Sequence, residues 1–328
     1  MDLSTLLLTK SDVENLVSIR DATEAVRSVF KEHGMGKTKS YPRVHIPFEE
    51  FNGTIGYLEA AVDSLDSSAS KIASLYFDNP NIGLPRIIAL ITLSRIDNGL
   101  PVAVMDGNYL TMLRTAAVSA VATDFLAKND ADTLGVIGAG VQGRGQLLGV
   151  KEVREIKRVI VYDISRNASE RFAHEMSSSL GVEVRIANSI NDLKVCDIIS
   201  CATPSKEPLI TENLLHEGLH INSVGMGAGL GKREVDFKIL RKTKVVVDDK
   251  EVAESESLSE AFKEGLITTR EIYASLGDLV LGKLKGREKD ETTIFISAGM
   301  AIQDVAVAKL AYDRAAEKGV GRKFNFFE

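Results

Sequence analysis

A glycine-rich turn between an apolar segment and a helical one constrains the fold of this chain more than any other feature. Residues 134–143 read Leu-Gly-Val-Ile-Gly-Ala-Gly-Val-Gln-Gly, a G-x-G-x-x-G pattern that ends a short strand-like run. A second strand-like run, residues 159–162, follows and leads into Asp163. A strand, a glycine turn, a helix and a second strand ending at an acidic residue are together typical of a βαβ unit that binds a dinucleotide.

Each glycine of this turn has its own physical role. Gly138 permits the tight turn, Gly140 lets the backbone approach a pyrophosphate, and Gly143 lets the helix pack closely against the strand. The helix N-terminus then offers free N–H groups and a positive dipole end to the phosphates. We therefore predict that the turn binds the cofactor through Gly138, Ala139, Gly140, Val141, Gln142 and Gly143.

Two residues after the second strand bear on which dinucleotide is bound. Asp163 is placed to accept the ribose hydroxyls, and its carboxylate would repel a 2′-phosphate, which favours NAD. Arg166 would attract that phosphate, so NADP stays open as the alternative. Because ligands bind at the carboxyl ends of parallel strands, loops after later strands should also line the cofactor site. The residues predicted there are Thr203, Ser205, Val224 and Gly225.

The apolar pattern changes near residue 130. After it, strand-like runs alternate with helical stretches, which predicts a parallel sheet covered on both faces. Before it, residues 41–93 alternate with period two between turns such as Asn52-Gly53, which predicts an antiparallel α+β block. Near the start, Ser11 and Glu14 read as a capping box, and Gly34 as the left-handed end of the second helix.

The predicted fold class is therefore α/β, a Rossmann-type doubly wound parallel sheet joined to an α+β domain. A chain of 328 residues suits two such domains. A final helix, residues 302–317, is expected to return to the first domain, which otherwise lacks a cover. We place the first domain at residues 1–115 with 300–328, and the NAD(P)-binding domain at residues 116–299.

Composition limits the partners. A net charge of −6 and a pI of about 5.6 provide no basic face for nucleic acid. No run approaches the roughly 18 apolar residues that span a bilayer, and no signal peptide is evident. Cys196 and Cys201 fall in one strand-like run, where their spacing would point them to opposite faces, so we expect free thiols. We predict a cytoplasmic protein that binds neither nucleic acid nor membrane.

Three basic residues stand in segments that otherwise read as buried, namely Arg43, Lys71 and Arg114. A buried charge is costly unless it is paired. In one interpretation these residues bind a substrate carboxylate, for which the planar fork of arginine is suited. In the other they form ion pairs with Glu59, Asp106 or Asp304, and the residues alone leave both open. The five histidines lack metal-ligand spacing, so we predict no metal site.

Several segments occur in one known family with the same order and spacing. They are residues 41–45, 70–72, 83–85, 106–117, the glycine turn, 231–236 and 299–306. The most specific is the run Met112-Leu113-Arg114-Thr115-Ala116-Ala117. On these segments the chain resembles the ornithine cyclodeaminase/μ-crystallin family along nearly its whole length.

The resemblance implies an NAD(P)-dependent oxidoreductase that interconverts an imino acid, or a keto acid plus ammonia, and an amino acid. Pyrroline-2-carboxylate and ketimine reductases and alanine dehydrogenases of the family do this. It also implies a homodimer formed through the sheet of the first domain. The first domain would also bind the substrate. By resemblance, the catalytic residues are Arg43, Lys71 and Arg114 at the substrate carboxylate, with Glu59 near the substrate, and Thr115 binds a cofactor phosphate.

One departure from the family bears on the reaction. Cyclodeaminases and the related alanine dehydrogenases carry an aspartate where residues 226–230 here read Met-Gly-Ala-Gly-Leu. This favours a reductase of a ready-made imine, for which Lys71 could donate the proton. The alternatives are an ornithine cyclodeaminase that uses bound NAD and releases ammonia, a dehydratase, and a crystallin-like binding protein without turnover. The sequence does not rank the individual amino or imino acids.

Overall fold

The computed structural model describes residues 3–225 and 233–327. The chain divides into two compact units, Met1–Arg114 with Met300–Glu328, and Thr115–Gly299. The first boundary falls inside the helix α3 (Gly107–Leu126), between Arg114 and Thr115. The first unit is therefore built from two segments that lie far apart in the sequence, and each unit is described by itself below.

The second unit contains a parallel sheet in the order β10-β9-β8-β11-β12-β15-β13-β14. All the strand pairings described within it are parallel. The chain builds outward from β8 to β10 and then returns to the other side of β8 with β11, so the strand order reverses there, as in a Rossmann fold. The strands are β8 (Thr133–Ile137), β9 (Arg158–Tyr162), β10 (Glu183–Ile186), β11 (Ile198–Cys201), β12 (His220–Ser223), β13 (Lys244–Val247), β14 (Ile272–Ser275) and β15 (Thr293–Ile296).

Helices and apolar clusters enclose this sheet. One buried cluster contains Phe172 and Leu147, and another contains Phe237 and Leu258. The helices are α4 (Val141–Val153), α5 (Arg166–Leu180), α6 (Lys250–Ser255), α7 (Ser259–Lys263) and α8 (Leu276–Val280). The α/β class with a parallel sheet and a separate antiparallel-rich sheet is confirmed.

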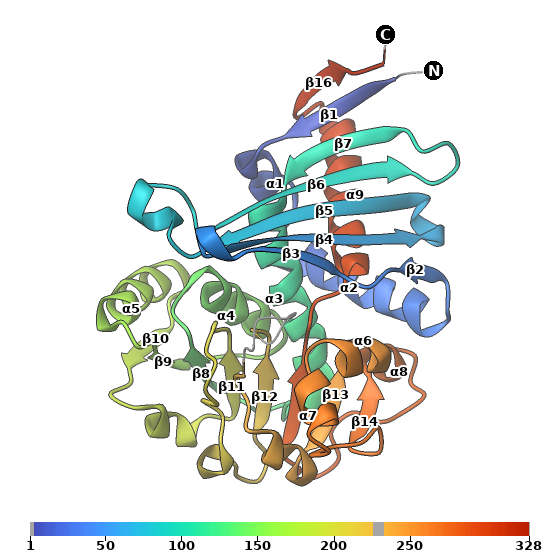
Figure 1. Cartoon of the computed structure of the whole chain (residues 1–328). Helices are drawn as coiled ribbons and strands as arrows, with labels where there is room; N and C mark the ends of the chain where they lie inside the picture. The colour runs from blue at the N-terminus through green and yellow to red at the C-terminus, as the bar shows by residue number, and fades with distance from the viewer. Residues whose placement is uncertain (1–2, 226–232, 328) are drawn as a thin grey trace. The chain divides into compact units, whose positions relative to one another are not determined.

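The first unit contains a mostly antiparallel sheet in the order β16-β1-β7-β6-β5-β4-β2, with β3 also paired to β4. Its strands are β1 (Ser4–Leu8), β2 (Thr38–Ser40), β3 (Val44–Phe48), β4 (Gly53–Val62), β5 (Ser67–Tyr76), β6 (Ile87–Arg95), β7 (Pro101–Asp106) and β16 (Arg322–Asn325). Its helices are α1 (Lys10–Leu16), α2 (Ile19–Gly34) and α9 (Ala301–Lys318). Figure 1 shows α9 passing behind the strands, and α9 contacts β4, β5, β6 and α2. The expected return of the last helix to this sheet is confirmed.

Two predictions about helix ends were wrong. The capping box of α1 consists of Thr9 and Asp12, because the helix begins at Lys10 and Ser11 already lies inside its first turn. Helix α2 runs through Gly34, and the left-handed residue that follows it is Gly36, with a φ of 71°. The Gly36 N–H donates to His33 O at 2.8 Å, which closes the helix end.

Both cysteines are buried free thiols, as expected. The reason differs in part, because β11 begins at Ile198 and Cys196 precedes the strand instead of lying in it. Burial raises the pKa of the Cys196 thiol to about 12, so this thiol stays protonated at neutral pH.

Candidate active site

The buried cations of the first unit gather around one carboxylate. Lys71 of β5 donates from Nζ to Oδ2 of Asp304 at 2.7 Å, and Nε of Arg114 lies 3.3 Å from Oδ1 of the same aspartate. The side chains are nearly buried, with exposed fractions of 3% for Lys71, 1% for Asp304 and 9% for Arg114. Of the three ion-pair partners left open by the sequence, Asp304 is therefore the one that Lys71 and Arg114 use.

Three elements position this cluster, namely β5, α9, and α3, which carries Arg114. Strand β5 directs Lys71 to its buried face, between exposed Ser70 and Ile72, because side chains alternate along a strand. The first turn of α9 contributes Asp304, and also Gln303, whose Oε1 accepts from Arg114 Nη1 at 3.0 Å. Sequence reasoning named Asp304 only as one partner of three and did not single out Gln303.

The environment of Lys71 is unusual for an ammonium group. Burial is the main influence that lowers its pKa, and the positive charges of Arg114 and Arg43 lower it further. The attraction and hydrogen bond of Asp304 act in the opposite direction, and the net pKa is about 7. Lys71 can therefore release or take up a proton near neutral pH, which ordinary lysines do not do.

The arginine retains hydrogen-bonding capacity. Within the described part of the chain, Arg114 Nε and Asp304 Oδ1 are both buried and neither makes a hydrogen bond, although they are close enough for ionic attraction. Lys71 and Arg114 share one carboxylate, so the three groups keep an excess positive charge when Lys71 is protonated. An anionic group of a ligand would be attracted there.

The other two residues predicted to be catalytic differ in placement. Arg43, which precedes β3, is half-buried and lies near enough for its charge to lower the pKa of Lys71. Glu59 is exposed on β4 between the buried residues Leu58 and Ala60, and it accepts a hydrogen bond from Ser70 Oγ at 3.3 Å. The structure therefore brings Arg43 toward the cluster and places Glu59 on the opposite face of the sheet from Lys71.

The glycine turn of the second unit has the geometry expected of it. Gly138 has a φ of 99°, and a Cβ there would lie 2.6 Å from Ala202 O. A Cβ on Gly143 would overlap the carbonyl oxygen of Gly138, which ties the start of α4 to the turn. A Cβ on Gly140 would meet nothing within 4 Å, so the space in front of this residue is open. That opening is where a pyrophosphate is expected to lie.

The beginning of α4 can bind an anion. Gly140 is the N-cap and provides no side-chain acceptor, so the first N–H groups of the helix remain available. Gln142 has a buried Oε1 without a hydrogen-bond partner, while Val141 is 65% exposed. Ala139 is buried, and its N–H donates to Asp163 Oδ2 at 2.8 Å.

Asp163 directly follows β9 and stabilises the glycine turn through its hydrogen bond with Ala139 N. Its second oxygen accepts from Ser165 N at 2.8 Å, and each carboxylate oxygen has a further lone pair for a ribose hydroxyl. Arg166 bonds to Glu170 at 3.4 Å and Asn188 at 3.3 Å. Two polar partners thus engage the guanidinium that was considered as a 2′-phosphate ligand.

The loops after β11 and β12 are held together by a residue that sequence reasoning did not select. Glu234 is fully buried and accepts hydrogen bonds from Thr203 of the first loop and Gly225 of the second. Ser205 caps its own loop by donating from Oγ to Glu207 O at 2.7 Å, and Val224 N donates to Cys201 O at 3.0 Å. The sequence signal was present, since Glu234 stands in the segment 231–236 that resembles the family.

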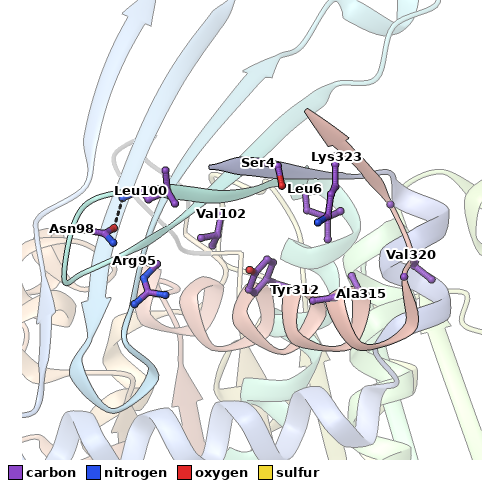
Figure 2. Close-up of a pocket in the computed structure, with 13 residues that line it drawn as sticks. Ser4, Leu6, Arg95, Asn98, Leu100, Val102, Tyr312, Ala315, Val320 and Lys323 are labelled. Carbon is purple, nitrogen blue, oxygen red and sulfur yellow. Dashed lines mark hydrogen bonds between the residues drawn. The ribbon is translucent and has the colours of Figure 1, made fainter. Parts of the chain in front are cut away.

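Thr115 is buried in α3, and its carbonyl oxygen accepts from Gln146 Nε2 of α4 at 3.4 Å. The segment 226–230, which lacks the family aspartate, lies outside the described residues. A cavity with a volume of about 580 Å³ lies between α9, β1 and β7 (Figure 2). Tyr312, Arg95 and Lys323 line it, and none of the candidate site residues does.

Comparisons with known proteins identify the family to which the chain belongs. The family model of the ornithine cyclodeaminase/mu-crystallin family matches residues 3–319. The alanine dehydrogenase of Archaeoglobus fulgidus is 37% identical over 99% of this chain and 99% of its own. The chain belongs to the ornithine cyclodeaminase/mu-crystallin family.

Two solved structures of the family are similar over nearly the whole chain. The Thermococcus litoralis Delta(1)-pyrroline-2-carboxylate reductase, in complex with NADH and L-proline, has a TM-score of 0.93 and 42% identity and covers 97% of this chain and 99% of its own. An archaeal alanine dehydrogenase dimer with bound NAD has a TM-score of 0.92 and 36% identity, with coverages of 99% and 100%. These comparisons confirm the predicted NAD cofactor and the predicted class, an oxidoreductase of imino or amino acids.

Proposed function

We propose that this family member reduces a preformed α-imino acid, of the pyrroline-2-carboxylate or ketimine type, to the amino acid. The observation that carries the proposal is the buried Lys71, which has a pKa of about 7 and lies beside two arginines. Reducing an imine consumes a hydride at carbon and a proton at nitrogen. When bound, NADH supplies the hydride, and the residues of this chain must supply the rest.

The substrate carboxylate is bound by the excess positive charge of the cluster. Arg114 offers donors that its contacts with Gln303 and Asp304 do not exhaust, and Arg43 adds a second guanidinium nearby. A bound carboxylate also favours the protonated form of Lys71 through its negative charge. Substrate binding therefore prepares Lys71 to donate its proton to the imine nitrogen.

Asp304 is the partner that keeps Lys71 in position and partly protonated. Its Oδ2 accepts from Nζ at 2.7 Å, which fixes the end of a long flexible side chain. Because Asp304 is nearly fully buried and opposite in charge, it raises the pKa of Lys71 against the effect of burial. After Lys71 has been reprotonated from solvent, its ammonium group can again donate a hydrogen bond to Asp304.

The second unit is proposed to hold the dinucleotide. The turn at Gly138–Gly143 and the open space at Gly140 suit a pyrophosphate, and Asp163 suits the adenosine ribose. Thr203, Ser205, Val224 and Gly225 follow β11 and β12 and are proposed to line the nicotinamide half, and Thr115 to bind a phosphate. Residues 116–299 thus form the proposed NAD-binding domain, and residues 1–115 with 300–328 the substrate-binding and dimerisation domain.

An exposed apolar face in the first unit supports a homodimer. Val44, Ile72 and Leu90 are 55%, 50% and 55% exposed, and cross-strand pairing aligns them in one row through Tyr57. A next row contains Ile46 and Ile88, which are also exposed. Monomers rarely expose contiguous apolar patches of this kind, and a two-fold axis can bury the same patch on both subunits. We propose this face of the sheet as the dimer interface.

Alanine dehydrogenase is the second candidate, because an enzyme of that name is 37% identical along the chain. The test is NADH consumption by the purified protein with pyrroline-2-carboxylate, piperideine-2-carboxylate, or pyruvate plus ammonia, while ammonia release from ornithine is followed in parallel. Consumption with a cyclic imine supports the proposal, and consumption only with pyruvate and ammonia supports the second candidate. Ammonia from ornithine without net NADH change would contradict both.

A further inference from the structure

Glu234 is a fully buried carboxylate to which the proposed chemistry assigns no role. Its Oε1 accepts hydrogen bonds from Thr203 N at 2.6 Å and Thr203 Oγ1 at 3.1 Å. Its Oε2 accepts from Ser223 Oγ at 2.7 Å and Gly225 N at 2.8 Å. One side chain therefore joins the loop that follows β11 to the end of β12 and the residues after it.

The backbone around Glu234 is fixed as firmly as its side chain. Leu209 N and Ile210 N both donate to Glu234 O, at 2.8 and 2.9 Å, and Arg233 N donates to Ser205 O at 2.8 Å. A Cβ on Gly225 would lie 2.7 Å from Glu234 Cδ, so Gly225 packs directly onto the carboxylate. The carboxylate is thus held from both sides. Any movement of its side chain would break hydrogen bonds to Thr203 or to Ser223 and Gly225.

The chemistry of the contacts requires two acceptor oxygens. Each oxygen faces a backbone N–H, which cannot reverse its role as a hydroxyl can. An amide in place of the carboxylate would turn its NH₂ toward either Thr203 N or Gly225 N, whichever way it was oriented. One buried N–H would then lose its acceptor, which is costly inside a protein. Burial raises the pKa of Glu234, and the hydrogen bonds oppose that effect.

The strand order indicates which half of the cofactor these loops face. In a doubly wound sheet the dinucleotide lies across the point where the strand order reverses, with one mononucleotide on each side. Asp163, the proposed ribose ligand, follows β9 on one side of β8, while Thr203 and Gly225 follow β11 and β12 on the other. The contacts of Glu234 with Thr203 and Gly225 are therefore on the side of the nicotinamide mononucleotide.

We propose that Glu234 is a positioning residue for the nicotinamide half of the cofactor site, which it fixes by holding the Thr203 and Gly225 loops at one spacing. The proposal rests on the proposed function in taking these two loops as cofactor-lining. It assigns Glu234 no contact with substrate or cofactor. Its action is to keep two backbone segments in register, so that the nicotinamide ring is held in one orientation.

The test compares two ligands that share every group except the nicotinamide. NADH and ADP-ribose are titrated against the wild type and the isosteric variant Glu234→Gln. We expect the variant to bind NADH roughly ten-fold more weakly, as the loss of one buried hydrogen bond implies, and ADP-ribose about as tightly as the wild type does. With the imine substrate, kcat should fall, and the primary isotope effect with NADH deuterated at C4 should rise because hydride transfer becomes slower.

Asp197→Asn is the matched control. Asp197 stands just before β11, at the opposite end of the same strand, and its Oδ2 accepts from Asp132 N and Thr133 N, both at 3.0 Å. It therefore also joins two backbone segments, through one carboxylate oxygen and away from the predicted cofactor loops. The control is expected to leave the affinities for NADH and ADP-ribose unchanged.

The possible results separate the two hypotheses. If the wild type binds neither NADH nor ADP-ribose, the proposed function fails. If the wild type binds both and Glu234→Gln loses neither, or loses both to the same extent, the role of Glu234 is refuted. Should Glu234→Gln not fold, Ser223→Ala removes one donor and keeps the carboxylate; a selective, few-fold loss of NADH affinity supports the proposal, and an unchanged affinity overturns it.

Discussion

Replacing Asp304 by asparagine tests the proposed proton donor directly. Asp304 provides the only influences that raise the pKa of Lys71 among those identified, while burial, Arg114 and Arg43 all lower it. The asparagine keeps the shape and an oxygen that can accept from Nζ, but it removes the negative charge. We therefore expect the pKa of Lys71 to fall below its value of about 7 and the lysine to become neutral at neutral pH.

The size of the effect follows from the geometry. Charges separated by 2.7 Å, as Lys71 and Asp304 are, attract by roughly 6 kcal/mol at an effective dielectric constant of about 20. Relaxation reduces this, and an opposite charge at such a distance ordinarily shifts a pKa by about 1–3 units. A fall of about 2 units leaves about 1% of Lys71 protonated at pH 7, against about half in the wild type. The imine reduction rate at pH 7 should then drop about 50-fold.

The assay is the pH profile of kcat/KM for imine reduction, measured between pH 4.5 and 9 with folding verified by circular dichroism. The descending limb near pH 7 should move to lower pH in Asp304→Asn, and the two enzymes should converge toward the acid end. Asp313→Asn, on the exposed face of the same helix, changes a pair with Lys309 and should leave the profile unchanged. An Asp304→Asn limb that stays near pH 7, or moves upward, would refute the role assigned to Lys71.

Three further predictions follow from the same structure. Because reduction needs Lys71 protonated and the reverse oxidation needs it neutral, kcat/KM for reduction should fall as pH rises through about 7, whereas kcat/KM for oxidation should rise; parallel profiles would contradict this. Arg114→Ala should lower imine turnover by at least about 100-fold while NADH titration shows nearly unchanged affinity, and a matching loss of NADH affinity would mean that Arg114 serves the nucleotide. Leu90→Asp should convert the proposed dimer to monomers in sedimentation analysis, whereas Ile164→Asp, at a 97% exposed residue of the other unit, should not; a dimeric Leu90→Asp variant would exclude this face.

The regular features of the fold could be predicted because they depend on local pattern. The glycine turn, the strand before it and Asp163 form one contiguous signal, and the structure reproduces its geometry at Gly138 and Gly143. The second strand-like run, predicted at residues 159–162, agrees with β9 (Arg158–Tyr162) to within one residue for the same reason. The N-cap of α1 was misassigned because Thr9 with Asp12 and Ser11 with Glu14 both satisfy the capping pattern, and the end of α2 because Gly34 and Gly36 can both adopt the left-handed conformation.

The site was less predictable because its partners meet through tertiary contacts. The sequence identified Arg43, Lys71 and Arg114 as buried cations, but the choice of Asp304 over Glu59 and Asp106 depended on how β5 and α9 pack. Glu59 lies on the opposite face of the sheet from Lys71 because a strand turns alternate residues to opposite faces, and a short motif does not say which face is buried. Asp106 instead accepts from Tyr109 N at 2.7 Å at the beginning of α3. Glu234 was missed because its partners stand 9 to 31 residues away along the chain.

The composition of the first unit from two distant segments has a consequence for biosynthesis. The partner of Lys71 lies 233 residues later in the chain, and the partner of Arg114 lies 189 residues later. At about 5–20 residues per second, a ribosome needs roughly ten to fifty seconds to add a stretch as long as the first of these. Throughout that time strand β5 and helix α3, which carry Lys71 and Arg114, exist without the helix that carries their partners. The Rossmann unit can therefore fold first on the nascent chain, and the substrate site is completed last, when α9 leaves the exit tunnel.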